Sequence, residues 1–398
     1  MADRGLDPEG LRRLQEGLAE HVARGTVPGL VAAVARGPEV HVEVLGRQRL
    51  DDPAPMRRDT LFRITSMTKP VTAVAAMLLV EDGRVGLDDP VDRFLPELAD
   101  RRVLRRLDGP LDETEPARRP ITLRDLLTFR AGIGMILEPS CHWPIQQAID
   151  GLQLMTGPPM PRTPHGADGW MARLGTLPLM HQPGERWMYG SASDIVGILV
   201  ARASGQPFDR FLAERVFAPL GMTDTDFHVP PEKRDRLAGC YRYDPATGAL
   251  VDQDPLAISQ WTRPPALPAG KDGLVSTVDD YLAFGRMLLG GGRLGSVRIL
   301  QPGTVAAMTT DQLTPAQKAV SPFFPGFWEG RGWGLGLSVV TEGATRGRFG
   351  WDGGFGTSWQ ADPALDFTGV LMTQRLVYPE PAGIDRDFWT LAERTIRH

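Results

Sequence analysis

The chain has 398 residues, of which 42% are apolar and 23% are charged, the composition of an ordinary globular protein with a sizeable core. Its net charge of −5 at neutral pH gives no reason to expect a nucleic-acid partner. The longest apolar run, residues 71–80, is about half of a membrane-spanning helix, and the N-terminus lacks an apolar leader. We therefore expect a cytoplasmic protein with no membrane partner.

Cysteine and histidine are sparse and scattered. Cys141 and Cys240 are too few for a disulfide framework, and neither lies in a metal-binding spacing. The seven histidines form no HxH or HExxH pattern. We therefore expect no metal and no cofactor, while the oligomeric state is not indicated.

The first predicted element is an amphipathic helix, because Leu11, Leu14, Leu18 and Val22 recur at helical spacing. Two short strands follow around a Gly37-Pro38 turn, and a mainly helical section comes next, broken by loops rich in proline and glycine. The expected strands span residues 30–35 and 40–45, and the expected helices span residues 66–80, 123–129, 192–203, 208–217 and 278–289.

The end of the chain returns to strands, expected over residues 334–340, 346–351, 357–362 and 367–374. A final helix carries Phe388, Trp389, Leu391 and Ile396. Strands at both ends with helices between them predict one sheet assembled from distant segments, with the helical section inserted over it. We expect a sheet domain formed by residues 1–64 and 274–398 and a mainly helical domain formed by residues 65–273.

A serine and a lysine stand three residues apart in Ser66-Met67-Thr68-Lys69, at the predicted start of a helix. On one helical turn the lysine amine lies on the same face as the serine hydroxyl. A lysine in a partly dry site can accept the hydroxyl proton, which an unassisted serine does not lose at neutral pH. Pro70 falls late for a first turn and predicts an irregular opening. The alternative is a capping Thr65 or Ser66 followed by a solvated lysine.

A second candidate pair, Tyr189 and Ser191, stands at the head of the helix expected over 192–203. Two residues apart, both side chains can face one cleft. A phenol beside an ammonium group can serve as base and later as acid, and Ser191 can offer a hydrogen bond to Lys69 or to substrate. The alternative is a buried tyrosine that ends a loop and a serine that caps the helix.

These segments resemble the serine β-lactamase/penicillin-binding-protein superfamily and, within it, class C β-lactamases, D-Ala-D-Ala carboxypeptidases and family VIII carboxylesterases. Matching segments follow in the same order from about residue 8 to about residue 395; they are Phe62–Lys69, Ile121–Thr128, Tyr189–Ser191, Pro219–Met222, Gly273–Thr277 and Gly334–Leu337. The resemblance implies an α/β (α+β) fold of the β-lactamase/D,D-peptidase type, with an antiparallel sheet flanked by N- and C-terminal helices. It also implies a cleft between the two domains, with Ser66 as nucleophile and Lys69 and Tyr189 transferring protons.

The third motif of that superfamily, Lys-Thr-Gly or His-x-Gly, has its counterpart by position in Trp351-Asp352-Gly353-Gly354. The resemblance implies that the Gly354 and Ser66 N–H groups form an oxyanion hole. Glycine at 353 and 354 suits a close approach to a ligand. We also expect substrate contacts from the following residues: Ser191, Trp351, Asp352, Gly353 and Phe355.

Trp351 stands where penicillin-recognising members have a cation for the substrate carboxylate. It resembles the Trp-Gly-Gly type of the esterase branch and favours a serine carboxylesterase acting on small, short-chain esters. A β-lactamase or D-Ala-D-Ala carboxypeptidase, an acyltransferase and a non-catalytic binding protein remain alternatives. Lys271 could supply a substitute cation, and residues 134–180 could form either a lid or an exposed connector.

Overall fold

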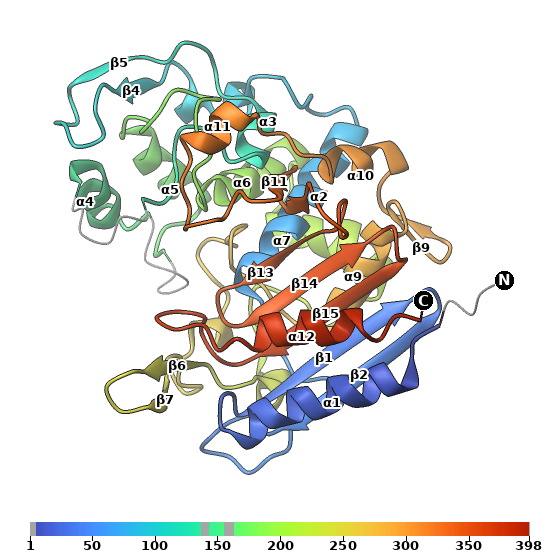
Figure 1. Cartoon of the computed structure of the whole chain (residues 1–398). Helices are drawn as coiled ribbons and strands as arrows, with labels where there is room; N and C mark the ends of the chain where they lie inside the picture. Colours follow the sequence, from blue (N-terminus) through green and yellow to red (C-terminus); the bar gives the residue numbers. More distant parts are fainter. Residues whose placement is uncertain (1–4, 137–142, 155–162, 398) are drawn as a thin grey trace.

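A seven-stranded antiparallel sheet joins the two ends of the chain in the computed structural model, which describes residues 5–136, 143–154 and 163–397 (Figure 1). Its strand order is β11-β12-β13-β14-β15-β1-β2. The strands are β1 (Gly29–Arg36), β2 (Glu39–Gly46), β11 (Arg331–Trp333), β12 (Ser338–Val340), β13 (Phe349–Gly353), β14 (Thr357–Asp362) and β15 (Phe367–Thr373). Because β1 pairs with β15, the predicted assembly of one sheet from distant segments is confirmed.

Two terminal helices, α1 (Pro8–Ala23) and α12 (Ile384–Glu393), lie together over one face of the sheet (Figure 1). In β1, Leu30 and Val34 belong to the apolar cluster under these helices, whereas Val31 and Ala33 belong to the larger cluster on the opposite face. Successive side chains of a strand point to opposite faces, so this strand is buried on both sides. The predicted flanking helices are confirmed.

The opposite face of the sheet carries α9 (Val278–Leu289), which contacts β1, β14 and β15. Helix α2 (Thr68–Glu81) packs on α6 (Ala192–Ser204) and is apolar nearly all round, as a fully buried helix requires. The remaining helices are α3 (Leu123–Leu127), α4 (Pro144–Gly151), α5 (Ala167–Gly175), α7 (Phe208–Leu212), α8 (Ala218–Leu220), α10 (Pro302–Met308) and α11 (Pro315–Ala319).

Short paired strands complete the secondary structure. They are β3 (Phe62–Arg63) with β8 (Val275–Ser276), β4 (Arg102–Leu104) with β5 (Thr114–Pro116), β6 (Tyr241–Asp244) with β7 (Ala249–Asp252), and β9 (Arg293–Leu294) with β10 (Val297–Arg298). The β3–β8 pair is important for the site, because it joins the chain just before Ser66 to the chain just after Lys271.

Several expected elements differ from the structure. The strand expected over 346–351 is β13, Phe349–Gly353, and the helix expected over 123–129 ends at Leu127. Ile396 lies beyond the final helix, which ends at Glu393. The strand expected over 334–340 is confined to β12, because Gly336 adopts a φ of 82° in a turn whose Cα lies against Ala73 of α2. The helix expected over 208–217 ends at Leu212 and continues as a wider π-helical turn over Ala213–Phe217. The two-domain division at residues 64 and 274 remains a prediction.

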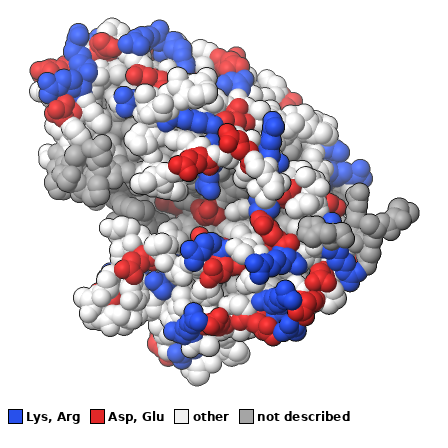
Figure 2. All heavy atoms as spheres, viewed as in Figure 1, with Lys and Arg blue, Asp and Glu red and all other residues white. Residues whose placement is uncertain are grey.

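Charged side chains of both signs are interspersed over the face seen in Figure 2. Within the described parts of the chain, none of the helices is both long enough and apolar enough to cross a membrane. Cys141 and portions of the 134–180 insertion lie outside the described residues, so both alternatives for this insertion, a lid and an exposed connector, remain predictions.

Candidate active site

Ser66 lies on a tight 3-10 turn, Thr65–Met67, that runs directly into α2. This turn confirms the irregular opening expected from Pro70. Thr65 has a φ of 42°, in the left-handed region that residues other than glycine seldom adopt. Such a conformation persists only where the surroundings hold it, and here the buried Tyr281 hydroxyl of α9 donates to the Met67 carbonyl at 2.7 Å.

Lys69 is only 2% exposed, and its amine is held between two oxygen atoms. Its Nζ donates to Ser66 Oγ at 2.9 Å and to the Lys271 carbonyl at 2.7 Å. A nucleophile within hydrogen-bond distance of a basic group is the arrangement needed for proton removal. The structure therefore brings the predicted pair together and excludes a solvated Lys69.

The Lys271 side chain does not face the site as an unpaired cation. Its Nζ lies 3.4 Å from Asp194 Oδ2, and its backbone N–H donates to Asp194 Oδ1 at 3.0 Å. Burial alone would lower the pKa of Lys271, but the carboxylates of Asp194 and Asp272, together with Tyr189, outweigh burial and raise this pKa. Asp194 thus fixes the segment whose carbonyl holds Lys69, so Lys271 positions the lysine base through its backbone.

Tyr189 lies over the amine, with the centre of its ring 4.6 Å from Lys69 Nζ. Its hydroxyl oxygen accepts a hydrogen bond of 2.9 Å from Trp351 Nε1. The ring is packed by Phe129, Trp187 and Phe323, whose centroids lie 5.9, 5.7 and 4.9 Å away. Trp351, which stands where the third motif of the resembling superfamily has a cation, therefore contacts Tyr189, the predicted acid–base residue.

Ser191 follows Tyr189 at the N-terminal end of α6 and is 2% exposed. That its side chain faces the same cleft as Tyr189 remains a prediction. Whether it contacts substrate remains a prediction.

The backbone of Gly353 lies close to the segment that leads into the Ser66 turn, Thr65–Met67. A Cβ at this position would collide with the Ile64 carbonyl and would lie 2.8 Å from Thr65 Oγ1. The glycine at 353 is therefore explained by packing against the chain, and a close approach of a ligand to it remains a prediction. At Gly354 a Cβ would meet nothing within 4 Å, which leaves open space there. The oxyanion hole of the Ser66 and Gly354 N–H groups remains a prediction.

Two expected substrate contacts lie away from the Ser66–Lys69–Tyr189 group. The Asp352 carboxylate accepts a hydrogen bond of 2.5 Å from Ser358 Oγ, which also accepts the indole N–H of Trp389 on α12. Because α12 covers the far face of the sheet, Asp352 points away from Trp351. Phe355 is 2% exposed and packs on Trp261 in a separate apolar cluster, with ring centroids 6.0 Å apart.

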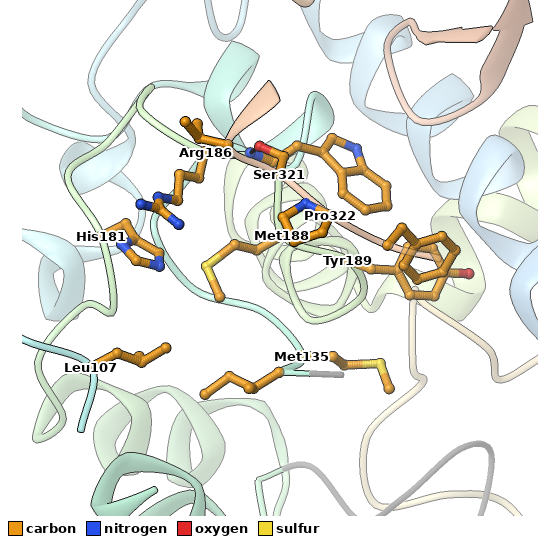
Figure 3. A pocket seen from close by; sticks show the side chains of 12 residues that line it. Leu107, Met135, His181, Arg186, Met188, Tyr189, Ser321 and Pro322 are labelled. Carbon is orange, nitrogen blue, oxygen red and sulfur yellow. Dashed lines mark hydrogen bonds between the residues drawn. The ribbon is translucent and has the colours of Figure 1, made fainter. Parts of the chain in front are cut away.

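A pocket of about 190 Å³ opens beside Tyr189 (Figure 3). Its apolar wall includes Met135, Ile136, Trp187, Met188 and Phe323. Figure 3 shows Tyr189 at one end and Arg186 with His181 at the other.

The sequence did not predict this pocket. Phe323 belongs to the aromatic-rich segment 323–328, which carries no helical or strand periodicity. Arg186 lies three residues before Tyr189 but belongs to no motif that would mark it as a binding residue. Aromatic density near the C-terminal strands was the one available signal. Among the described residues, no group of three histidine, cysteine, aspartate or glutamate side chains is placed to hold a metal.

The chain is similar in sequence and in fold to several known proteins. A family model described as Beta-lactamase matches residues 14–394. Protein Rv1367c of Mycobacterium tuberculosis is 43% identical over 90% of this chain and 89% of its own length. Esterase EstB of Burkholderia gladioli is 32% identical over 87% of this chain and 85% of its own length. The solved structure of EstCE1, a hydrolase with promiscuous acyltransferase activity, is 25% identical, covers 96% of this chain and 98% of its own, and has a TM-score of 0.80.

Proposed function

The chain belongs to the Beta-lactamase family and is a serine hydrolase, and we propose that it is a carboxylesterase that forms an acyl-enzyme on Ser66. The observation that carries this proposal is the 2.9 Å hydrogen bond between Lys69 Nζ and Ser66 Oγ, with the Tyr189 ring over the same amine. Nucleophile, base and a second proton carrier are thus in contact.

In the proposed reaction, Ser66 Oγ attacks the ester carbonyl while Lys69 and Tyr189 take its proton. The oxyanion is held by the Ser66 and Gly354 N–H groups. Tyr189 then protonates the leaving alcohol, and it later activates the water that hydrolyses the acyl-enzyme. Small, short-chain esters suit the pocket of about 190 Å³, which is below the usual size of drug-sized ligand sites.

Trp351 supports an ester in preference to a penicillin. Its indole N–H donates a hydrogen bond to the Tyr189 hydroxyl. It carries no positive charge that could bind a substrate carboxylate beside the third motif. The nearby Lys271 ammonium is paired with Asp194. A β-lactamase or D-Ala-D-Ala carboxypeptidase is therefore the less favoured function.

Acyl transfer is the second candidate, because the structurally similar EstCE1 combines hydrolase and acyltransferase activity. Transfer differs from hydrolysis only in the acceptor that attacks the acyl-enzyme. Adding methanol or butanol during turnover distinguishes them: an acyltransferase yields the new ester at the expense of the free acid.

The decisive test is Ser66→Ala. We expect p-nitrophenyl acetate hydrolysis to fall by about a thousandfold or more, since loss of a nucleophile removes the acyl-enzyme route. Ser204→Ala is the control, because that hydroxyl donates to the Ala201 and Gln206 carbonyls and accepts from the Gln206 N–H, all backbone groups at the end of α6. A fluorophosphonate probe should label the wild type at Ser66. Retained activity in Ser66→Ala, or nitrocefin turnover as efficient as ester turnover, would overturn the proposal.

A further inference from the structure

The pocket beside Tyr189 has apolar walls and one charged residue. Of the twelve side chains drawn in Figure 3, only Arg186 carries a full charge at neutral pH. Glu185 lies nearby but lines an adjoining pocket, which shares Leu107, His181 and Arg186 with this one. A single cation at the end of an apolar pocket is an arrangement that selects one kind of ligand group.

Among the described residues, the Arg186 guanidinium takes part in no ion pair, and its Nε is buried without a hydrogen-bond acceptor. Other arginines of the chain are paired: Arg202 with Glu97 at 2.8 Å, and Arg124 with Asp88 at 2.7 Å. A partly buried cation without an ion-pair partner is costly, and a planar carboxylate would satisfy it with two parallel hydrogen bonds.

His181 lies at the same end of the pocket and is uncharged at neutral pH. Burial, reinforced by the positive charge of Arg186 and opposed by Glu185, lowers the pKa of His181 to about 4. A neutral imidazole can still donate one hydrogen bond to an anion. The pair therefore presents one positive charge and an additional donor.

The other end of the pocket is formed by Tyr189, whereas Ser66 and Lys69 do not line it. Tyr189 lines the pocket and covers Lys69, which bonds to Ser66. In the proposed function Tyr189 protonates the leaving alcohol, so the pocket extends from the alcohol side of the ester. Its small volume accommodates a short chain between Tyr189 and Arg186.

We propose that this pocket binds the alcohol portion of esters that end in a carboxylate, with Arg186 as the anion-binding residue. The inference rests on the proposed esterase function and specifies its substrate class. The chain between ester and carboxylate is apolar and short, because it passes Met135, Met188 and Phe323.

The experiment compares 4-acetoxybutanoate, 6-acetoxyhexanoate and 8-acetoxyoctanoate with butyl, hexyl and octyl acetate. The measured quantity is the ratio of kcat/KM for each acid to kcat/KM for the neutral ester of equal length. Arg186→Gln should lower this ratio by about tenfold for the best-fitting length, since a hydrogen bond to a charged group is lost. Arg186→Lys, which keeps the charge but not the planar fork, should lower the ratio less.

Arg105→Gln is the matched control, because it removes the same charge from the adjoining pocket only. Its ratio should equal that of the wild type. An unchanged ratio in Arg186→Gln, or an equal fall in Arg105→Gln, would overturn the subsite.

A measurement on the wild type keeps the inference testable if Arg186→Gln does not fold. The free alcohol 6-hydroxyhexanoate should inhibit competitively with a lower inhibition constant than 1-hexanol, and a higher constant would overturn the proposal. Failure of the esterase function itself is distinguishable, because then neither the acids nor the neutral esters are hydrolysed. Hydrolysis of neutral esters with no dependence on Arg186 overturns only the anion subsite.

Discussion

The two sides of the active site are built in different ways. The side that carries Ser66 and Lys69 is held by buried polar contacts from segments far apart in the chain, among them Tyr281 and Lys271. The side that carries Tyr189 is held by ring packing, with Phe323 and Trp351 centroids 4.9 and 5.6 Å from the tyrosine. Only the second side borders the pocket shown in Figure 3.

This difference separates chemistry from selectivity. Hydrogen bonds fix atoms to within tenths of an ångström and are costly to leave unpaired, which suits a nucleophile and its base. Apolar packing depends on shape and volume and tolerates substitution better, which suits a wall that selects substrates. Changes on the first side should therefore affect folding or turnover as a whole, and changes on the second side should be graded.

The largest expected effect is on the nucleophile side, at Arg63 in β3. Its side chain pairs with Asp254, both being 2% exposed, and its Nη1 donates to the Ala238 carbonyl at 2.7 Å. Arg63→Met should lower the free energy of unfolding by about 3–5 kcal/mol, because it leaves the Asp254 carboxylate buried and unpaired. Urea denaturation measures this change.

Arg58→Met is the matched control for Arg63, since Arg58 pairs with Asp279 at 2.7 Å in an exposed position. An exposed pair contributes below about 1 kcal/mol. Equal destabilisation by the two variants would show that buried polar contacts do not distinguish this side of the site.

A smaller effect is expected at Trp351, which joins the third motif to the tyrosine side. Trp351→Phe keeps an aromatic ring but removes the N–H that positions the Tyr189 oxygen. We expect kcat to fall by about tenfold with little change in KM, the result of losing one hydrogen bond that orients a proton carrier. The pH–rate profile should shift as well, which a purely structural role would not cause.

Trp359→Phe serves as its control, because that indole N–H donates to Thr368 Oγ1 at 3.1 Å in the core. Its kcat and pH profile should match those of the wild type. If both variants lose activity to the same extent, loss of packing explains the Trp351 effect.

The smallest effect is expected at His181, whose pKa lies at about 4 compared with an ordinary value of 6.5. Between these values the unfolded chain binds more protons than the folded chain, so this histidine makes stability rise with pH from about 4 to 6.5. When the pH falls from 7 to 5, the wild type should therefore lose more free energy of unfolding than His181→Gln does. We expect the two losses to differ by about 1 kcal/mol, allowing for screening by solvent. Urea denaturation at the two pH values checks this, and equal losses would contradict it.

Much of the fold could be predicted from periodicity. Helix α9 and strand β14 begin and end where the sequence indicates. Strands β1 and β2 are one residue longer at each end than expected, and β15 ends one residue earlier. Their apolar patterns match the surfaces that they bury. The strand expected at 334–337 is a turn because Gly336 must pass close to α2, a tertiary contact that local pattern does not contain.

For the site, residue spacing was enough to predict that Ser66 and Lys69 share one helical turn and that Tyr189 stands at the head of another helix. Local spacing alone decides the first relation, since three residues span one turn. Only the tertiary structure placed Tyr189 over Lys69, paired Lys271 with Asp194, and turned Asp352 and Phe355 away from the catalytic group. These contacts join residues that are mostly far apart in the chain, so they depend on how the sheet, α2 and α6 pack, which no short sequence segment encodes.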